Sequence, residues 1–276
     1  MGCCRWGTLI AVELLSSRQV EAMRRAGAVA AATLERVGRA LRPTMTARDI
    51  DRIVREDTAA RGARPAQLGY HGFPATVCVS IDDVACHGIP GDQVLEAGSV
   101  VSVDVTSELD GWHGDTCRTF AIGELAPDAA HLMAVARQCM EAGIAEVRHG
   151  ARLGDVGHAI ESLAKREGCD VVRAVGGHGI GRQMHQRPHV DHFGERGRGL
   201  RLREGMALTV EPILVLGSPE LIEDDDGWTL RTADGSLAAQ LEHTLLVTRR
   251  GAEILTRPPA SESDNPASTP PIVPGA

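Results

Sequence analysis

Leu95-Glu-Ala-Gly-Ser-Val-Val-Ser-Val-Asp104 is the stretch of sequence that decides the fold. The chain repeats it in outline as Leu202-Arg-Glu-Gly-Met-Ala-Leu-Thr-Val-Glu211, with leucine, glycine and valine matched and a carboxylate after each apolar run. Upstream, residues 46–54 align in the same way with residues 152–160. Such a repeat predicts two similar halves that each deliver an acidic residue to one place. Chance similarity between two amphipathic stretches is the alternative.

In each half we expect two helices followed by several strands. Apolar residues recur at helical spacing over 18–41, 46–62, 128–147 and 152–168. Strand patterns cover residues 76–80, 100–106, 116–122, 207–216, 228–231 and 237–248. Because short turns join consecutive strands, we expect antiparallel pairing. The predicted fold class is therefore α+β, with helices packed on one face of a curved sheet.

Composition narrows the possible functions. The chain has a net charge of −8 and only one lysine, so no specific nucleic-acid binding is expected, and an aromatic content of 3% is too low for a base-stacking surface. Its seven cysteines include no C-x-x-C pair, which is typical of reduced thiols. No apolar run approaches the roughly 18 residues of a membrane span, and no signal peptide is apparent. We therefore expect a cytoplasmic protein with no membrane contact.

The length of 276 residues suits one large domain between two expendable ends. Residues 1–11 show no periodicity and are expected to be a disordered or mis-started extension. Residues 258–276 are rich in proline, serine and threonine, which predicts a disordered tail. Residues 12–257 form the predicted domain, with similar halves at about 12–125 and 126–257.

Two aspartates in the first half are candidate metal ligands. Asp104 lies between valines on a strand pattern, where a carboxylate needs a cation or several hydrogen-bond donors. Asp110-Gly111 is a strong turn signal, and Asp115 precedes the strand that returns from it, so a hairpin would set Asp104 and Asp115 opposite or diagonal to each other. The two carboxylates would repel each other unless a multivalent cation lay between them. For Asp115 alone, a place beside a solvent-exposed turn is an equal alternative.

The second half supplies matching candidates. Glu211 follows the apolar run 206–210, and Glu242 stands at the head of the run 245–248. His178 lies in the glycine-rich segment 176–181, where backbone can approach closely. Four carboxylates and one imidazole suit two divalent ions with bridging carboxylates better than a structural zinc with cysteine ligands.

Two further histidines stand at special places. His87 occupies a turn shortly after the strand pattern at 76–80, and His185 follows closely on His178. Histidines beside a metal site can shuttle protons or donate a hydrogen bond to a developing oxyanion. A structural role is the more common one for a histidine taken alone, and we assign no role to the remaining histidines.

Seven short strings, in this order and spacing, resemble the type I methionine aminopeptidases, which are metallopeptidases of the pita-bread fold. The strings are LGYHGFP (68–74), VACHGIP (84–90), VDVT (103–106), DGWHGDT (110–116), GGHGIG (176–181), VEP (210–212) and AQLEHT (239–244). The resemblance covers about residues 12–257. It implies internal pseudo-two-fold symmetry and a monomeric enzyme that removes the initiator methionine of nascent polypeptides when the second residue is small.

The resemblance also implies which residues act. Five side chains would hold two divalent ions, of Co, Mn, Fe or Zn: Asp104, Asp115, His178, Glu211 and Glu242. Among these, Asp104 would chelate the first ion, and Asp115 and Glu242 would bridge both. Glu211 would also accept a proton from the water that the metals activate for attack on the peptide carbonyl.

Around the substrate, the resemblance implies that His87 contacts the scissile amide and His185 the carbonyl oxygen as the tetrahedral intermediate forms. It implies a methionine pocket of Tyr70, Phe73, Cys78 and Trp228. Aromatic rings and a soft sulfur suit a thioether, while plain core packing is the alternative for each residue. The chain departs from the family pattern at Gln67, Met184 and Gln186-Arg187. These departures bear on pocket width and substrate affinity and leave the chemistry unchanged.

Two other functions match part of the pattern. Proline-specific aminopeptidases and dipeptidases of the same fold share the five ligands but usually carry an extra N-terminal domain. A non-catalytic binding protein of this fold would have lost its ligands, and here all five are present. Four arginines precede the apolar run at 206–210, and a solvated loop is the favoured interpretation of them, with a transient contact with the ribosome as a hypothesis that their clustering suggests: Arg196, Arg198, Arg201 and Arg203.

Overall fold

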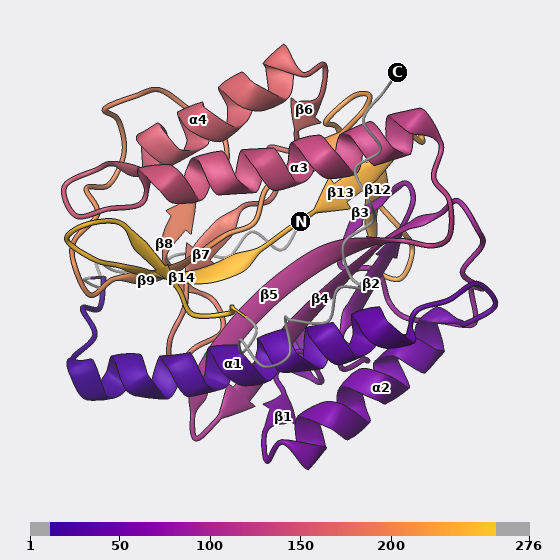
Figure 1. Cartoon of the computed structure of the whole chain (residues 1–276), viewed down its shortest axis with the longest axis horizontal. Coiled ribbons are helices and arrows are strands. Elements are labelled where there is room, and N and C mark those ends of the chain that lie inside the picture. Colours follow the sequence, from indigo (N-terminus) through magenta and orange to yellow (C-terminus); the bar gives the residue numbers. More distant parts are fainter. Residues whose placement is uncertain (1–11, 258–276) are drawn as a thin grey trace, which may run out of the picture.

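A computed structural model describes residues 12–257 of the chain (Figure 1). The expectations for residues 1–11 and 258–276 lie outside the described residues. The α-helices are α1 (Ser17–Ala40), α2 (Ala47–Ala60), α3 (Pro127–Glu146) and α4 (Leu153–Arg166), and a short 3₁₀ turn, η1, covers Tyr70–Gly72. None of the helices in this part of the chain is long and apolar enough to cross a membrane.

All four predicted helices are confirmed, and the second helix of each half begins in the same way. The Thr46 N–H donates to Asp49 Oδ2 over 3.0 Å, and the Arg152 N–H donates to Asp155 Oδ2 over 2.8 Å. Each aspartate thus satisfies a backbone donor that the helix itself leaves unpaired. The two aspartates hold matching places in the sequence repeat, so the repeat has a structural counterpart.

The strands form four antiparallel sheets. They are β1 (Arg64–Pro65), β2 (Cys78–Ile81), β3 (Val84–Cys86), β4 (Val100–Leu109), β5 (Trp112–Ala121), β6 (Asp170–Val171), β7 (Gly177–Gly179), β8 (Gln186–Val190), β9 (Ala207–Val210), β10 (Ile213–Val215), β11 (Leu221–Glu223), β12 (Leu230–Thr232), β13 (Ala238–Gln240), β14 (His243–Val247) and β15 (Ala252–Ile254). Their orders are β1-β4-β2 with β5 on β4, β13-β10-β6, β11-β12-β3 and β15-β14-β9-β7-β8. Antiparallel pairing, as predicted, holds throughout these sheets.

Two predicted strands, over 207–216 and 237–248, are wrong as continuous strands. The first breaks at Glu211 into β9 and β10, and the second breaks at Glu242 into β13 and β14. Because β9 pairs with β14 and β10 pairs with β13 in another sheet, both strands change sheets at the same level. Pro212 has no N–H with which to continue a ladder, which explains the first break. The two breaks lie opposite each other in the paired strands, and this brings Glu211 and Glu242 close together.

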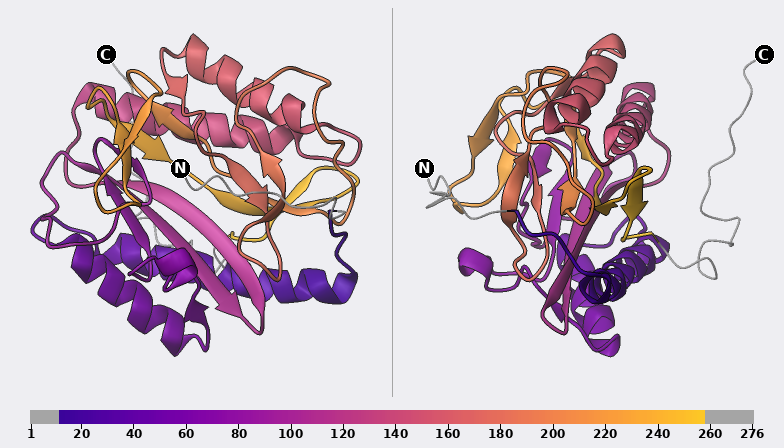
Figure 2. Two further views of the ribbon diagram at one scale, coloured as in Figure 1. Left: turned by 180° about the vertical axis from the view of Figure 1, so that it is seen from behind. Right: turned by 90° about the vertical axis from the view of Figure 1, so that its left-hand side faces the viewer.

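The helices pack in two pairs, on either side of the long β4–β5 hairpin in the view of Figure 1. Helix α1 lies across β4 and β5 with α2 beside it, whereas α3 lies against β9, β10 and β13 with α4 beside it. Seen from the side, the helices gather toward one face of the sheets (Figure 2). Each pair covers a separate hydrophobic core, one around Ile50 and Val103 and the other around Ile160 and Leu208. The division into halves at residues 125 and 126 remains a prediction.

Helix α1 and strand β5 touch backbone to backbone at two glycines. A Cβ on Gly114 would lie 2.5 Å from the Cα of Gly27, which is closer than real Cβ contacts come. Any side chain at Gly114 would therefore push the helix off the sheet. This close packing fixes the position of β5 against α1 at Gly114, the residue immediately before Asp115.

Candidate metal centre

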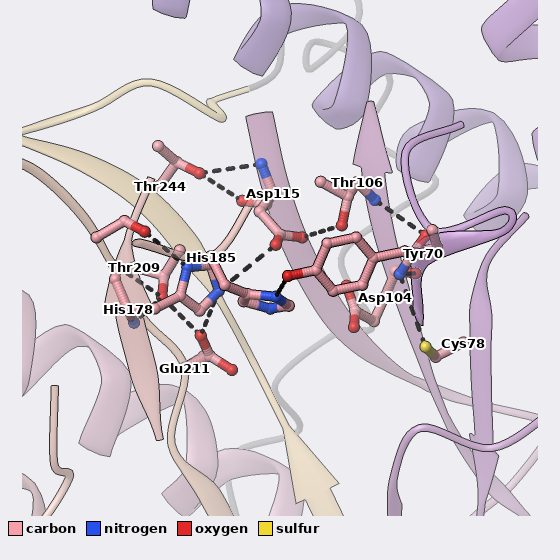
Figure 3. A network of polar contacts seen from close by, with 12 residues as sticks. Tyr70, Cys78, Asp104, Thr106, Asp115, His178, His185, Thr209, Glu211 and Thr244 are labelled. Carbon is pink, nitrogen blue, oxygen red and sulfur yellow. Dashed lines mark hydrogen bonds and ion pairs between the residues drawn. The ribbon is translucent and has the colours of Figure 1, made fainter. Parts of the chain in front are cut away.

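The five side chains predicted as ligands come from β4, β5, β7 and the breaks that follow β9 and β13. Figure 3 shows four of them, Asp104, Asp115, His178 and Glu211. Asp115, His178 and Glu242 are buried, and each offers a ligand atom within 4.8 Å of the other two. His178 Nε2 lies 3.7 Å from Asp115 Oδ2 and 3.4 Å from Glu211 Oε1. Asp104 joins the cluster through a side-chain contact with Asp115. The first and second halves of the chain therefore contribute to one cluster.

The β4–β5 hairpin sets the spacing of the two aspartates. In its register Asp104 faces Cys117 and Thr106 faces Asp115. Asp104 and Asp115 therefore lie diagonally on the same face of the hairpin, within reach of each other. This diagonal arrangement confirms one of the two relative positions that the turn at Asp110 predicts.

The cluster carries more buried negative charge than its own donors can satisfy. Asp104 Oδ1 and Glu242 Oε1 are buried and have no hydrogen-bond partner among residues 12–257. Burial, followed by repulsion from neighbouring carboxylates, raises the pKa of both groups well above the ordinary values. Burial also raises the pKa of Asp115 to about 6 and that of Glu211 to about 8. Unpartnered, buried carboxylate oxygens of this kind call for a cation.

His178 supplies a neutral nitrogen to the same cluster. Burial lowers the pKa of its imidazole to about 4. Its Nδ1–H donates to the carbonyl oxygen of Gly179 over 3.1 Å, which leaves Nε2 as a free acceptor facing the carboxylates. An imidazole held in this way, with its second nitrogen bonded to backbone, is typical of a metal-ligating histidine. Four carboxylates with one neutral imidazole fit divalent ions that prefer oxygen and nitrogen ligands.

Threonine hydroxyls support the carboxylates from behind. Thr106 Oγ1 donates to Asp115 Oδ1 over 2.8 Å, and Thr209 Oγ1 donates to Glu211 Oε1 over 2.6 Å. We assigned neither threonine a role from the sequence. The signal was present, because each stands two residues from an acidic candidate on the same strand, and alternate residues of a strand share a face.

His192 is a second supporting residue that sequence reasoning missed. Its side chain is almost fully buried, and its Nε2 accepts a hydrogen bond from the Glu211 N–H over 3.0 Å. Burial lowers the pKa of His192 to about 3, so the ring is neutral and Nε2 can accept. The contact joins residues far apart in sequence, and no local pattern could have revealed it.

His185 and Tyr70 meet beside the cluster. The ring of His185 packs edge to face on that of His178, with centroids 4.2 Å apart. Its Nδ1 is hydrogen-bonded to the hydroxyl of Tyr70 over 2.8 Å (Figure 3). Tyr70 and His185 also line an open cavity of about 570 Å³ that reaches Met184 and His113.

The other three residues predicted to form the methionine pocket lie together. Phe73 and Cys78 belong to one buried cluster, against which Trp228 packs with its ring centroid 5.1 Å from that of Phe73. The ring of His87 faces Trp228 at 6.5 Å. Burial raises the pKa of the Cys78 thiol well above its ordinary value, so its sulfur is neutral. The five cysteines within the described residues are all free and buried, as expected.

We expect the metal-free protein to lose stability as the pH rises from 6.5 to 8. Folding raises the pKa of Glu211 from 4.5 to about 8, so its contribution to stability is present below pH 4.5 and is lost as the pH rises through about 8. Asp104 and Glu242 shift in the same direction. Buried His178 and His192 act in the opposite sense, but only below their ordinary pKa of 6.5.

Thermal unfolding followed by circular dichroism measures this effect between pH 6.5 and 8. The same scan with a divalent ion present is the control, because a bound cation favours the ionised carboxylates and should remove the decline. A melting temperature that stays level or rises over this range without metal would contradict the repulsion assigned to the carboxylates.

Comparisons with known proteins place this geometry in context. The chain matches the model of metallopeptidase family M24 over residues 21–249. It is similar to methionine aminopeptidase A of Synechocystis sp., with 46% identity over 246 residues that cover 89% of this chain and 97% of that protein. The crystal structure of methionine aminopeptidase from Rickettsia prowazekii shares 42% identity with a TM-score of 0.88, and the match covers 90% of this chain and all of that one.

A more distant structure shares the fold alone. Prolidase from Pyrococcus furiosus matches with a TM-score of 0.72 and 18% identity. The match covers 88% of this chain but 65% of the prolidase chain. The stronger similarity is thus to methionine aminopeptidases along nearly their whole length.

Proposed function

The chain belongs to metallopeptidase family M24, and from this premise we propose that the cluster of five side chains removes the initiator methionine with two divalent ions when the second residue is small. The protein is a methionine aminopeptidase of the pita-bread fold that uses divalent metal and acts on the N-termini of nascent proteins. The number of ions, their ligands and the preference for a small second residue are the proposed part. The observation that carries it is the pair of buried, unpartnered oxygens on Asp104 and Glu242.

Within this proposal each ligand has a place. Asp115 and Glu242 would be shared by the two ions, and with His178 they offer three ligand atoms within 4.8 Å of one another. Asp104 would help to hold one ion, and His178 with Glu211 would help to hold the other. Co, Mn, Fe and Zn all suit this donor set. Divalent ions bound here would lower the pKa of a water molecule and polarise the carbonyl of the peptide bond.

Glu211 is the proposed proton acceptor. Its carboxylate has a pKa near neutrality in the metal-free protein, which suits a group that takes up a proton and releases it again. Thr209 donates a hydrogen bond to one carboxylate oxygen of Glu211, and His192 accepts one from the backbone N–H of Glu211. Both contacts keep the carboxylate aimed at the cluster while a proton arrives.

His185 and His87 are the proposed substrate contacts. His185 stacks against His178, and Tyr70 holds its Nδ1, so Nε2 is the nitrogen left to meet the carbonyl oxygen. A donor at that oxygen stabilises the negative charge that develops during attack. His87 faces Trp228 and would contact the scissile amide from the side of the methionine pocket. Phe73, with Cys78 and Trp228, would surround the thioether, while Tyr70 would border it.

A panel of short peptides tests the function. We expect rapid release of methionine from Met-Ala-Ser and no release of the first residue from Ala-Ala-Ser or Ala-Pro-Ser. Met-Leu-Ser is the matched control for the second position and should be cleaved much more slowly, because a small second residue is required. Faster hydrolysis of Ala-Pro-Ser, measured by release of free amino acid, would favour the alternative of a proline-specific peptidase.

We propose that the protein acts as a monomer in the cytoplasm and makes transient contact with the ribosome. The contact surface consists of Arg196, Arg198, Arg201 and Arg203. All four are exposed. Two of them form ion pairs, with Arg196 3.9 Å from Glu146 and Arg198 3.6 Å from Glu195, and exposed pairs of this kind contribute little energy, so phosphates could replace their acidic partners.

Ribosome co-sedimentation at low salt measures this contact. Replacing all four arginines by alanine should abolish it, because phosphate contacts supply most of such affinity. Exposed arginines elsewhere serve as the matched control: Arg18, Arg36, Arg52 and Arg55. Two results would count against this surface: an equal loss of co-sedimentation in the control variant, or no loss in the variant that lacks Arg196, Arg198, Arg201 and Arg203.

A further inference from the structure

One edge of strand β4 lacks a strand partner next to the metal cluster. On this edge β1 pairs with Ser107 and Glu108, whereas β2 pairs with β4 from Val101 to Asp104. The β1 side contributes one more backbone bond, from the Ala66 N–H to the Thr106 carbonyl at 2.8 Å. Asp104 therefore stands at the end of the β2 ladder, and the Thr106 N–H, beyond Val105, needs a partner from another source.

The side-chain amide of Gln67 fills this gap. Its Nε2–H donates to the Asp104 carbonyl over 2.8 Å, and its Oε1 accepts from the Thr106 N–H over 3.2 Å. A donor and an acceptor on one planar amide are the groups that a strand residue would offer. Gln67 is only 6% exposed, so both contacts are shielded from water. Its Nε2 also lies 3.7 Å from Cys78 Sγ.

Both residues that Gln67 holds belong to the cluster. Asp104 carries the buried Oδ1 that has no hydrogen-bond partner, and the hydroxyl of Thr106 donates to Asp115. Strand β4 stays paired with β5 along its other edge, but two repelling carboxylates on a strand with one free edge could twist its backbone and change their separation. Clamping the backbone on either side of Val105 opposes that movement.

We propose that Gln67 is a positioning residue that holds Asp104 and, through Thr106, Asp115 at the separation that metal binding needs. The proposal rests on the proposed function for the identity of the ligands. Gln67 itself touches neither metal nor substrate in this account. Supporting contacts of this kind orient ligands before the metal arrives, and their loss typically lowers metal affinity by about 10- to 100-fold.

Gln67→Met tests this role, since methionine keeps the length of the side chain and loses both hydrogen bonds. Metal-free protein is titrated with Mn²⁺ by isothermal calorimetry, which needs no turnover. We expect affinity to fall by about 10- to 100-fold. The Mn²⁺ concentration for half-maximal hydrolysis of Met-Ala-Ser should rise in parallel. Gln138→Met, on the exposed face of α3, is the matched control and should bind Mn²⁺ as the unchanged protein does.

The outcomes separate this inference from the assignment of the ligands. If Gln67→Met binds Mn²⁺ with unchanged affinity while Asp104→Ala does not bind, the role of Gln67 is wrong and the ligand set stands. If Asp104→Ala also binds normally, the ligand set itself is wrong. A lower melting temperature with unchanged Mn²⁺ affinity would indicate a merely structural role and overturn the proposal. Should Gln67→Met not fold, Gln67→Asn replaces it, because the shorter amide cannot span both backbone groups.

Discussion

Glu242→Ala is expected to lose bound metal and nearly all turnover. Glu242 is 2% exposed, and one of its oxygens has no hydrogen-bond donor within residues 12–257, as expected of a carboxylate that meets a cation. Loss of a ligand shared by two ions removes several kcal/mol of transition-state stabilisation. That corresponds to at least about a thousand-fold in kcat/KM. Metal content by atomic emission and hydrolysis of Met-Ala-Ser measure the two effects on the same sample. Asp104→Ala should likewise lose bound metal and nearly all turnover.

The same substitution should not unfold the metal-free protein. Removing one of several mutually repelling carboxylates relieves strain, so the melting temperature of metal-free Glu242→Ala should equal or exceed that of the unchanged protein. Glu96→Ala, an exposed carboxylate on a turn, is the matched control and should retain both metal and activity. Full metal content in Glu242→Ala would contradict its role as a bridge.

His185→Ala is expected to lower kcat by about 100- to 1,000-fold while metal content stays unchanged. His185 stacks on the predicted ligand His178 but does not belong to the carboxylate cluster, so its loss removes a donor to the carbonyl oxygen and leaves the ligands in place. Because that donor acts mainly on the transition state, KM should change far less than kcat. Steady-state kinetics on Met-Ala-Ser separates the two constants.

Two further variants sharpen this prediction. His189→Ala removes an exposed histidine on β8, the strand that follows His185, where it pairs with Asp191, and should leave kcat unchanged. Tyr70→Phe keeps the ring but loses the hydroxyl bonded to Nδ1 of His185, so we expect a smaller fall in kcat than for His185→Ala. Loss of metal from His185→Ala, or an unchanged kcat, would refute its role at the carbonyl oxygen.

Much of the fold could be predicted because its determinants are local. The periodicity of apolar residues located all four helices, and the turn at Asp110 located the β4–β5 hairpin. The repeat predicted matching helices, and Asp49 and Asp155 indeed start them in the same way. Each of these features depends on residues a few positions apart, which is the range over which sequence patterns are informative.

The breaks at Glu211 and Glu242 could not be predicted from periodicity. Apolar residues continue past both positions, so a single long strand satisfies the pattern equally well. What ends each strand is its change of partner, since β9 and β10 pair in different sheets. Pro212 was the one local signal, because proline cannot donate to a ladder.

Part of the candidate site was also out of reach. The carboxylates of the cluster could be anticipated, because each acidic candidate stands within or beside an apolar strand pattern and such carboxylates need a cation. His192 and Gln67 could not, because each contacts β9 or β4 only after the chain has folded across a long loop. The catalytic and ligand roles themselves remain predictions until the variants above are measured.

Titration of chelator-stripped protein with Co²⁺, while Met-Ala-Ser hydrolysis is followed, tests the central claim most directly. Excess EDTA should abolish hydrolysis, because without cations the buried carboxylates cannot act on water. Activity should then return with added Co²⁺ and reach its maximum at no more than two ions per chain. Full activity in the continued presence of excess EDTA would contradict the account.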